Sequence, residues 1–188
     1  YLWHIAPDSS RVVYLADQDT DDVSELYSVP IDGSQAPVKL NGTLVVGGDV
    51  LVDPASPLNN EPYAISPDST RVVYSDVNGV SYCVPSDGSA SPVQLNSVPV
   101  ASAETNGLCQ LSPDGTRALF PIQGGNLPVY DAALRLLTVP LTGGTPVEVS
   151  APLVAGEDAV GTFAISPDSA YVVYTTVKFT IFPQGVGV

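Results

Sequence analysis

Apolar residues in this chain fall in short runs separated by turn residues, and no window keeps a helical period. In the stretch YAISPDSTRVVY (63–74), an aromatic and an aliphatic residue precede a Pro-Asp turn, and a β-branched run follows it. Proline presets the backbone angle of the second turn position, and Asp suits the third. β-branched and aromatic residues fit the pleated surface of a strand. The pattern therefore predicts β-hairpins, and the 18 Pro and 16 Gly residues argue against long helices.

The hairpins recur in a unit of about 55 residues. Val-Pro pairs begin at positions 29, 84 and 139, Pro-Val pairs at 37, 92 and 146, and Pro-Asp pairs at 7, 67, 113 and 167. Each unit predicts four strands: the two of the Pro-Asp hairpin, a third that ends in Val-Pro, and a short fourth that starts with Pro-Val. The third and fourth are joined by IDGS, SDGS or LTGG, which are typical hairpin turns. Segment 131–138 could be read as helix, but its alignment with the third strands predicts a strand.

Four such units make up one predicted domain over residues 1–188. They span approximately 1–60, 61–106, 107–160 and 161–188, and the last is incomplete, with 177–182 as a candidate third strand. Successive four-stranded units predict an all-β fold, a β-propeller of four-stranded antiparallel blades, with about three and three-quarter blades in this chain. Three completions stay open: further chain in a larger propeller, closure as a small four-bladed ring, or blade edges completed by a second subunit.

The succession ISPDS-x-RVVY, ELYSVPIDGS and PVKL resembles the TolB-like, WD-related propeller repeat over almost the whole chain. This resemblance implies a scaffold that presents one face or a central channel to partners. Similar repeats also form the substrate-gating propeller of prolyl-oligopeptidase-type serine peptidases, whose hydrolase domain and serine motif are absent from this sequence. Trp3, Tyr63 and Phe163 recur at the repeat spacing, and we expect them to be blade core.

Charge narrows the choice of partners. Twenty acids, fifteen of them Asp, face six bases, and the net charge is −14. Such a surface repels phosphate backbones and anionic lipids, so we expect no nucleic-acid partner. No apolar run approaches the ~18 to 20 residues of a membrane span. The chain starts without Met or a signal-like segment, so we expect a mature product or a fragment. The high Asp content, the two lysines, the lack of Met and the family resemblance favour a place at the cell surface, in the periplasm or outside the cell.

The sharpest local feature is the acidic stretch ADQDTDDVSEL (16–26). Alternating oxygens in a tight loop are how hard cations such as Ca²⁺ are bound. The spacing resembles the short D-x-D-x-D-G-x-x-D loops of some β-propellers, with an Asp where the pattern has Gly. The alternative is an acidic hairpin that points into water. The candidate ligands, with Ca²⁺ as the cofactor considered, are Asp17, Asp19, Asp21, Asp22 and Glu25.

A second charge pattern lies at the Pro-Asp turns. The Asp of the turn is followed three residues later by Arg in three of the four units, as in Asp8 and Arg11. This spacing allows an ion pair across the hairpin. Exposed ion pairs contribute only about 0 to 1 kcal/mol, so we expect instead that these carboxylates accept hydrogen bonds from turn amides.

Two features bear on covalent chemistry. Cys83 and Cys109 are too few for a disulfide framework and lie at non-equivalent places in the repeat, so we expect two separate buried thiols, with a bridge as the alternative. The sequon Asn41-Gly42-Thr43 is a candidate glycan acceptor.

Catalysis has little support in the sequence. His4 is the one histidine, and it aligns with Ala64, Gln110 and Ala164 at an ordinary strand position, so we expect a structural role. Triad chemistry needs a nucleophile, a base and an orienting group within reach, and the chain has no G-x-S-x-G elbow. We therefore predict that the chain is not an enzyme.

The expected function is that of a non-catalytic, extracytoplasmic propeller that binds a protein or serves as a structural scaffold. One alternative is a self-assembling filament or surface-layer subunit, whose blade edges are completed by neighbouring copies. The other is the substrate-gating propeller of a prolyl-oligopeptidase-type peptidase whose catalytic domain is absent from this chain.

Overall fold

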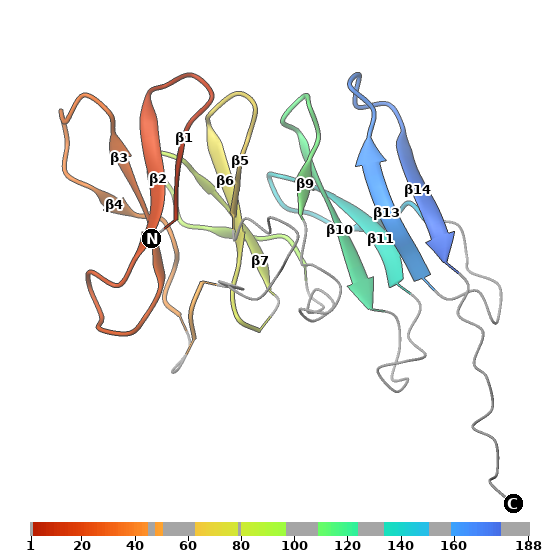
Figure 1. Ribbon diagram of the computed structural model, residues 1–188, viewed down its shortest axis with the longest axis horizontal. Coiled ribbons are helices and arrows are strands. Elements are labelled where there is room, and N and C mark those ends of the chain that lie inside the picture. The colour runs from red at the N-terminus through yellow and green to blue at the C-terminus, as the bar shows by residue number, and fades with distance from the viewer. Residues whose placement is uncertain are drawn as a thin grey trace, which may run out of the picture.

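The computed structural model describes residues 2–44, 48–50, 63–78, 80–96, 109–123, 134–150 and 159–177, and all the regular structure in these ranges is β (Figure 1). The first seven strands are β1 (Trp3–Ile5), β2 (Arg11–Ala16), β3 (Glu25–Pro30), β4 (Val38–Lys39), β5 (Tyr63–Ile65), β6 (Arg71–Ser75) and β7 (Ser81–Pro85). The next seven are β8 (Val93–Gln94), β9 (Gln110–Leu111), β10 (Arg117–Gln123), β11 (Leu134–Pro140), β12 (Val147–Glu148), β13 (Ala159–Ile165) and β14 (Val172–Val177).

Hydrogen bonding arranges these strands as propeller blades. Strands β1 to β4 form one antiparallel sheet in chain order, and β5 to β8 form a second. Strands β9 to β12 repeat the arrangement, and β13 joins β11 through a single parallel bridge, Leu134 to Ala159, with β14 beyond it. We call these groups blades 1 to 4. The described residues thus contain three four-stranded blades and two strands of a fourth, which confirms the predicted repeat.

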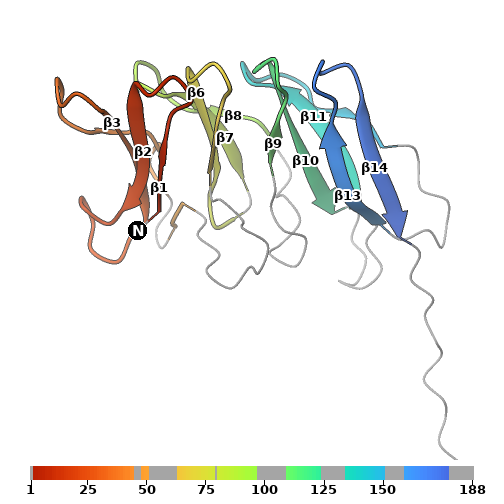
Figure 2. The same cartoon turned by 45° about the horizontal axis from the view of Figure 1, so that its top comes forward.

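The blades stand side by side in one row (Figures 1 and 2). Blades 1 and 4 lie at opposite ends of this row, so the described residues do not close into a four-bladed ring, one of the three completions considered. The hairpin turns lie along one edge of the row, at the top of Figure 1, and the loop between β2 and β3 lies along the other. We call the edge with the turns the turn face.

Each Pro-Asp turn is held by its own side chains. In blade 2 the Ser66 hydroxyl donates to Asp68 Oδ1 at 2.6 Å and accepts the Arg71 N–H at 2.9 Å. The Thr70 N–H donates to the same Asp68 oxygen. Blades 3 and 4 repeat these bonds, and the fourth turn position has a positive φ in every blade, at Ser9, Ser69, Gly115 and Ser169.

The Asp residues of the turns do not pair with the following Arg among the ion pairs of the described residues. Arg11 Nε instead donates to Ser28 Oγ at 2.8 Å, and Arg117 Nε donates to Thr138 Oγ1 at 2.9 Å. The arginine thus ties the second strand of a blade to the third, and the expectation that the carboxylates bind turn amides is confirmed.

The core lies between neighbouring blades. The second strand of each blade alternates its side chains between the two sides: Val72 and Tyr74 pack toward blade 1, and Val73 packs toward blade 3. Val13 of blade 1 and Leu119 of blade 3 occupy the position of Val73, and all three are at most 1% exposed. Burial of such a side chain stabilises the fold by about 1.5–3 kcal/mol. One blade cannot bury both of its faces alone, which is why the unit is repeated.

Other local predictions have mixed outcomes. The stretch 131–138 contains the start of β11 at Leu134, so its described part is strand, as predicted. The candidate third strand 177–182 lies outside the described residues except for Val177, the last residue of β14. Cys83 and Cys109 are free thiols, as expected, and both belong to the cluster between blades 2 and 3, where Cys83 is buried and Cys109 is partly buried.

Candidate functional site

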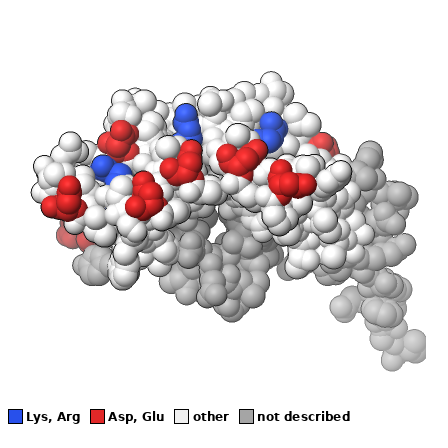
Figure 3. Space-filling model, turned by 90° about the horizontal axis from the view of Figure 1, so that it is seen from above, with Lys and Arg blue, Asp and Glu red and all other residues white. Residues whose placement is uncertain are grey.

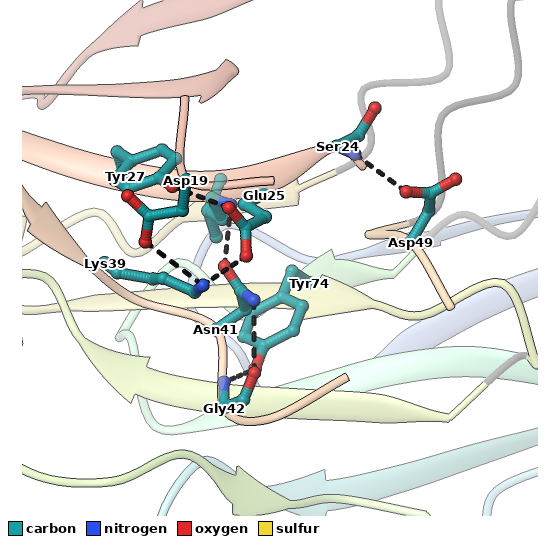
Figure 4. Close-up of polar contacts among 10 residues, drawn as sticks. Asp19, Ser24, Glu25, Tyr27, Lys39, Asn41, Gly42, Asp49 and Tyr74 are labelled. Atoms are coloured by element: carbon teal, nitrogen blue, oxygen red, sulfur yellow. Dashed lines mark hydrogen bonds and ion pairs between the residues drawn. The ribbon is translucent and has the colours of Figure 1, made fainter. Parts of the chain in front are cut away.

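The acidic loop of blade 1 leads into an ion pair between the exposed Lys39 and the buried carboxylate of Glu25, rather than an open carboxylate site (Figure 4). Glu25, the first residue of β3, is 3% exposed and accepts the Tyr27 hydroxyl at 2.7 Å and the Lys39 ammonium. Lys39 Nζ also lies 3.3 Å from Asp19 Oδ2. The hydrogen bond to Glu25 raises the pKa of Lys39, and burial, with Glu25 beside it, raises the pKa of Tyr27. The ammonium therefore sits between two of the five predicted metal ligands.

These residues do not fit a calcium ion. Ca²⁺ takes six to eight oxygen ligands, and both oxygens of Glu25 are already engaged by Lys39 and Tyr27. Asp17, Asp21 and Asp22 are exposed on the loop, and Asp22 has a φ of 60°. Within the described residues, no three His, Cys, Asp or Glu side chains are grouped to hold a metal. Calcium binding at this loop stays a prediction that the geometry does not favour.

Blade 3 carries the same ion pair with its charges exchanged. Arg135 Nη1 lies 3.1 Å from Glu148 Oε2, and these residues occupy the places of Glu25 and Lys39. In blade 1, Lys39 of the fourth strand is paired in register with Tyr27, two residues after Glu25. In blade 3, Glu148 is paired in the same way with Leu137, two residues after Arg135. The pair therefore connects the third and fourth strands of a blade. This pair is not among the features predicted from the sequence, although ELYSV with PVKL and RLLTV with PVEV contain the signal.

A buried polar clamp recurs beside this pair. Asn41 Oδ1 accepts the Leu26 N–H at 2.8 Å, Asn96 Oδ1 accepts the Ser81 N–H at 2.7 Å, and Ser150 Oγ accepts the Leu136 N–H at 3.1 Å. Asn41 also donates to the Gly42 carbonyl and is 6% exposed. Its amide therefore serves the fold, and the geometry does not support the glycan acceptor expected from the sequon. The endings KLN, QLN and EVS of the fourth strands were the available signal.

The turn face carries a row of carboxylates (Figure 3). Hydrogen bonds from neighbouring Ser side chains are the largest of the causes that lower the pKa of each of these carboxyls, so they stay ionised at neutral pH. Between blades 1 and 2, Asp8, Asp68 and Asp87 border an open hollow of about 410 Å³ that Arg71 and several hydroxyls also line. The hollow suits a polar group, and the Thr70 hydroxyl in it donates to Asp68 Oδ2 at 2.9 Å as part of the turn. The six carboxylates are Asp8, Asp32, Asp68, Asp87, Asp114 and Asp168.

The other candidates for chemistry serve the blade interfaces. The His4 ring packs edge-on against Tyr63 of blade 2, with centroids 5.2 Å apart, which supports its expected structural role. Burial raises the pKa of the Cys109 thiol to about 12 and raises that of Cys83. Because the thiolate is the nucleophile, these two thiols are poor reactive groups.

The end faces of the blade row expose side chains that are buried inside it. Trp3 and Ile5 of β1 are 61% and 47% exposed, whereas Tyr63, in the place of Trp3, is 3% exposed. At the other end, Val173 is 67% exposed, whereas Val73, in the same place, is 1% exposed. The expectation that Trp3 is blade core is therefore wrong for the described structure, because no described blade precedes blade 1. Repeat alignment alone could not reveal this.

Comparisons with known proteins bear on the fold. No protein-family model matches the chain, and no curated protein matches it significantly. The tricorn protease matches 89% of this chain with a TM-score of 0.60 and 10% identity. Dipeptidyl peptidase 4 of Porphyromonas gingivalis matches 94% of this chain with a TM-score of 0.65 and 11% identity. The β-propeller domain of the Trilobed protease from Pyrococcus furiosus matches 95% of this chain with a TM-score of 0.54 and 9% identity.

These matches establish the class of the protein. Together with the blade topology, they show that the chain has a β-propeller fold, and at such identities they show the fold alone. The chain spans 14%, 29% and 55% of those three structures. An oligogalacturonate lyase in complex with manganese matches 90% of this chain with a TM-score of 0.54 and 13% identity, and half of that structure is covered. In the described part of this chain, no helix is long and apolar enough to cross a membrane.

Proposed function

We propose that this chain is a non-catalytic propeller module that binds protein through the end faces of its blade row and acts as a scaffold outside the cytoplasm. The observation that carries the proposal is the exposure of Trp3 and Val173, whose equivalents inside the row are buried. A protein that covers these faces gains about 1.5–3 kcal/mol for each large apolar side chain that it buries. Exposed apolar patches of this kind mark interaction sites.

Two further points support the proposal. The described groups with reactive potential are engaged in the fold: His4 packs on Tyr63, Glu25 pairs with Lys39, and the thiol pKa values are raised. The TolB-like repeat resemblance also favours a scaffold, and with the high Asp content it favours a place at the cell surface or in the periplasm. Fold resemblance by itself carries limited weight for function.

Site-specific photo-cross-linking tests the proposal without assuming a partner. A photoreactive amino acid replaces Trp3, Val173 or, as the control, Thr142, an exposed residue of the turn face in blade 3. The proposal predicts protein adducts from positions 3 and 173 in the cells that make the chain, and few from position 142. Equal or absent adducts at all three positions contradict it.

A second candidate is the substrate-gating propeller of a serine peptidase. The protease structures that match this chain favour it. In that case the species cross-linked at position 3 or 173 carries a hydrolase domain and reacts with a serine-directed fluorophosphonate probe. Cross-linked species that do not react with the probe favour the scaffold.

A further inference from the structure

Two positions at the junction of blades 2 and 3 depart from the repeat, and both hold cysteine. One lies in the third strand, where blades 1 and 3 have the hydroxyl residues Ser28 and Thr138 and blade 2 has Cys83. The other lies where the first strand starts, at which Tyr63 and its equivalents in blades 1 and 4 are aromatic and blade 3 has Cys109. We propose that Cys83 and Cys109 form a covalent modification site, at which the two thiols are oxidised to a disulfide that ties blade 2 to blade 3.

The junction of blades 1 and 2 shows that these two positions lie on the same blade interface. The Tyr63 hydroxyl of blade 2 donates to the Val13 carbonyl of blade 1 at 2.7 Å. Val13 is in turn paired in register with Ser28 on the neighbouring strand. The first-strand side chain of one blade therefore points at the strand pair that holds the third-strand position of the preceding blade.

The same positions meet at the junction of blades 2 and 3. Val73 stands in the place of Val13 and is paired in register with Cys83, and both residues are at most 1% exposed. Cys109 packs against the cluster that contains these two residues. Burial raises the pKa of the Cys109 thiol, and the charge of a Cys83 thiolate raises it further, which agrees with two sulfur atoms in one cluster.

This junction also lacks the side chains that link blades 1 and 2. There the Asp8 N–H donates to Ser69 Oγ at 3.0 Å, in addition to the link made by Tyr63. Between blades 2 and 3, Gly115 stands in the place of Ser69, and Cys109 stands in the place of Tyr63. Glycine has no hydroxyl and a thiol is a weak donor, so neither link can form in the same way. A disulfide would place one covalent link at the junction where both hydrogen-bonding side chains are replaced.

The bond forms by thiol–disulfide exchange, with a low-molecular-weight disulfide as the oxidant. One cysteine loses its proton to water, its thiolate attacks a sulfur of the oxidant, and the first small thiol leaves. The thiolate of the second cysteine then attacks the protein sulfur of this mixed disulfide and releases the second small thiol. In sum, two protein thiols lose two protons and two electrons, and the oxidant takes them up as two thiols.

Burial decides when this exchange can take place. In the folded chain, burial is the main cause that raises the pKa of both thiols, and only the thiolate attacks. The exchange is therefore slow once the blades have packed. We expect the bond to close while the chain folds in an oxidising compartment, which suits the proposed place outside the cytoplasm. The bond does not depend on which partner covers the end faces.

The expected consequence is a more stable junction. A cross-link stabilises a fold mainly because it restricts the unfolded chain. Cys83→Ser is the matched control, because blade 1 has Ser28 at this position, where Arg11 Nε donates to its hydroxyl at 2.8 Å. The control therefore removes the bond and introduces a residue that the repeat already accepts.

The test starts from the unfolded, reduced chain, which is refolded in a mixture of reduced and oxidised glutathione. Free thiols are then alkylated with iodoacetamide in denaturant, and the mass of the chain is measured. Cleavage after Glu104, which lies between the two cysteines in the sequence, places them on separate peptides unless a disulfide joins them. We expect no alkylated cysteine and one joined pair of peptides, and two alkyl groups when the refolded chain is reduced before alkylation.

Stability gives a second readout. The urea midpoint of the refolded chain should fall when a reductant breaks the bond, whereas the midpoint of Cys83→Ser should not respond to the reductant. Two alkylated cysteines after refolding, glutathione adducts, or a bond between two chains overturns the proposal. So does a midpoint that ignores the reductant in the unchanged chain, or one that responds equally in Cys83→Ser.

Discussion

The backbone N–H of Asp8 donates to the hydroxyl of Ser69, 61 residues away, and so joins the turns of blades 1 and 2. Asp114 and Ser169 make the same link between blades 3 and 4. Between blades 2 and 3 the place of the serine is taken by Gly115, which has no hydroxyl to accept from Asp68. An ideal Cβ on Gly115 would lie 3.6 Å from Asp68 Cγ, an ordinary contact distance. The link is therefore missing because glycine has no hydroxyl, and not because the two turns lie too far apart.

Gly115→Ser should complete the series. Gly115 has a φ of +69°, so any side chain there carries strain, and the matched comparison is with Gly115→Ala. Both variants share the strain, but only the serine offers an acceptor to the Asp68 N–H. We expect Gly115→Ser to be more stable than Gly115→Ala by about 0.5–1.5 kcal/mol in urea unfolding. Equal stabilities would show that the turn-to-turn link contributes nothing.

We expect the fold to tolerate exchange of the two charges between positions 25 and 39, but not loss of the lysine alone. Lys39→Met leaves the buried Glu25 carboxylate without its cation, and we expect a cost of about 1–3 kcal/mol in the free energy of unfolding. The double variant Glu25→Arg with Lys39→Glu copies the arrangement of Arg135 and Glu148, so it should recover most of that loss. A double variant no more stable than Lys39→Met would show that blade 1 cannot hold the ion pair with the cation on the third strand and the carboxylate on the fourth, as blade 3 does.

The turn carboxylates should make stability fall in acid. The Ser112 hydroxyl and the Thr116 amide hold the pKa of Asp114 below its usual value of 3.8. A carboxyl with a lowered pKa in the folded state stabilises the fold above its unfolded pKa, and this contribution is lost as the pH falls through its folded pKa. The chain should therefore be more stable than Asp114→Asn from neutral pH down to about pH 4, and the difference should vanish at lower pH. Asp21→Asn controls for the loss of one charge, and a pH-independent difference would contradict the account.

Calcium should leave the fold unchanged. Lys39 lies between Asp19 and Glu25, so the acidic loop offers no open carboxylate cage. The thermal midpoint should be the same in calcium and in EDTA. A midpoint that rises with calcium, and that loses this response in Asp17→Asn, would restore the loop as a metal site.

The architecture could be predicted because it depends on local chemistry that repeats. Pro-Asp turns, β-branched strands and Val-Pro strand ends mark each blade in the sequence, and the structure places them as expected. The metal hypothesis considered only the acidic loop and so missed Lys39, which comes from a neighbouring strand 14 residues from Glu25. The exposure of Trp3 could not be predicted from the sequence either, because it depends on which blades are neighbours and not on the residue itself.

Fluorescence of Trp3 tests the proposed binding through the end faces most directly, because it is the one tryptophan of the chain and is exposed at the blade 1 end of the row. We expect acrylamide to quench Trp3 readily in the chain alone, and to quench it poorly once a protein that cross-links from position 3 is added. Quenching that is already poor in the chain alone, or that the added protein leaves unchanged, would contradict binding through this face.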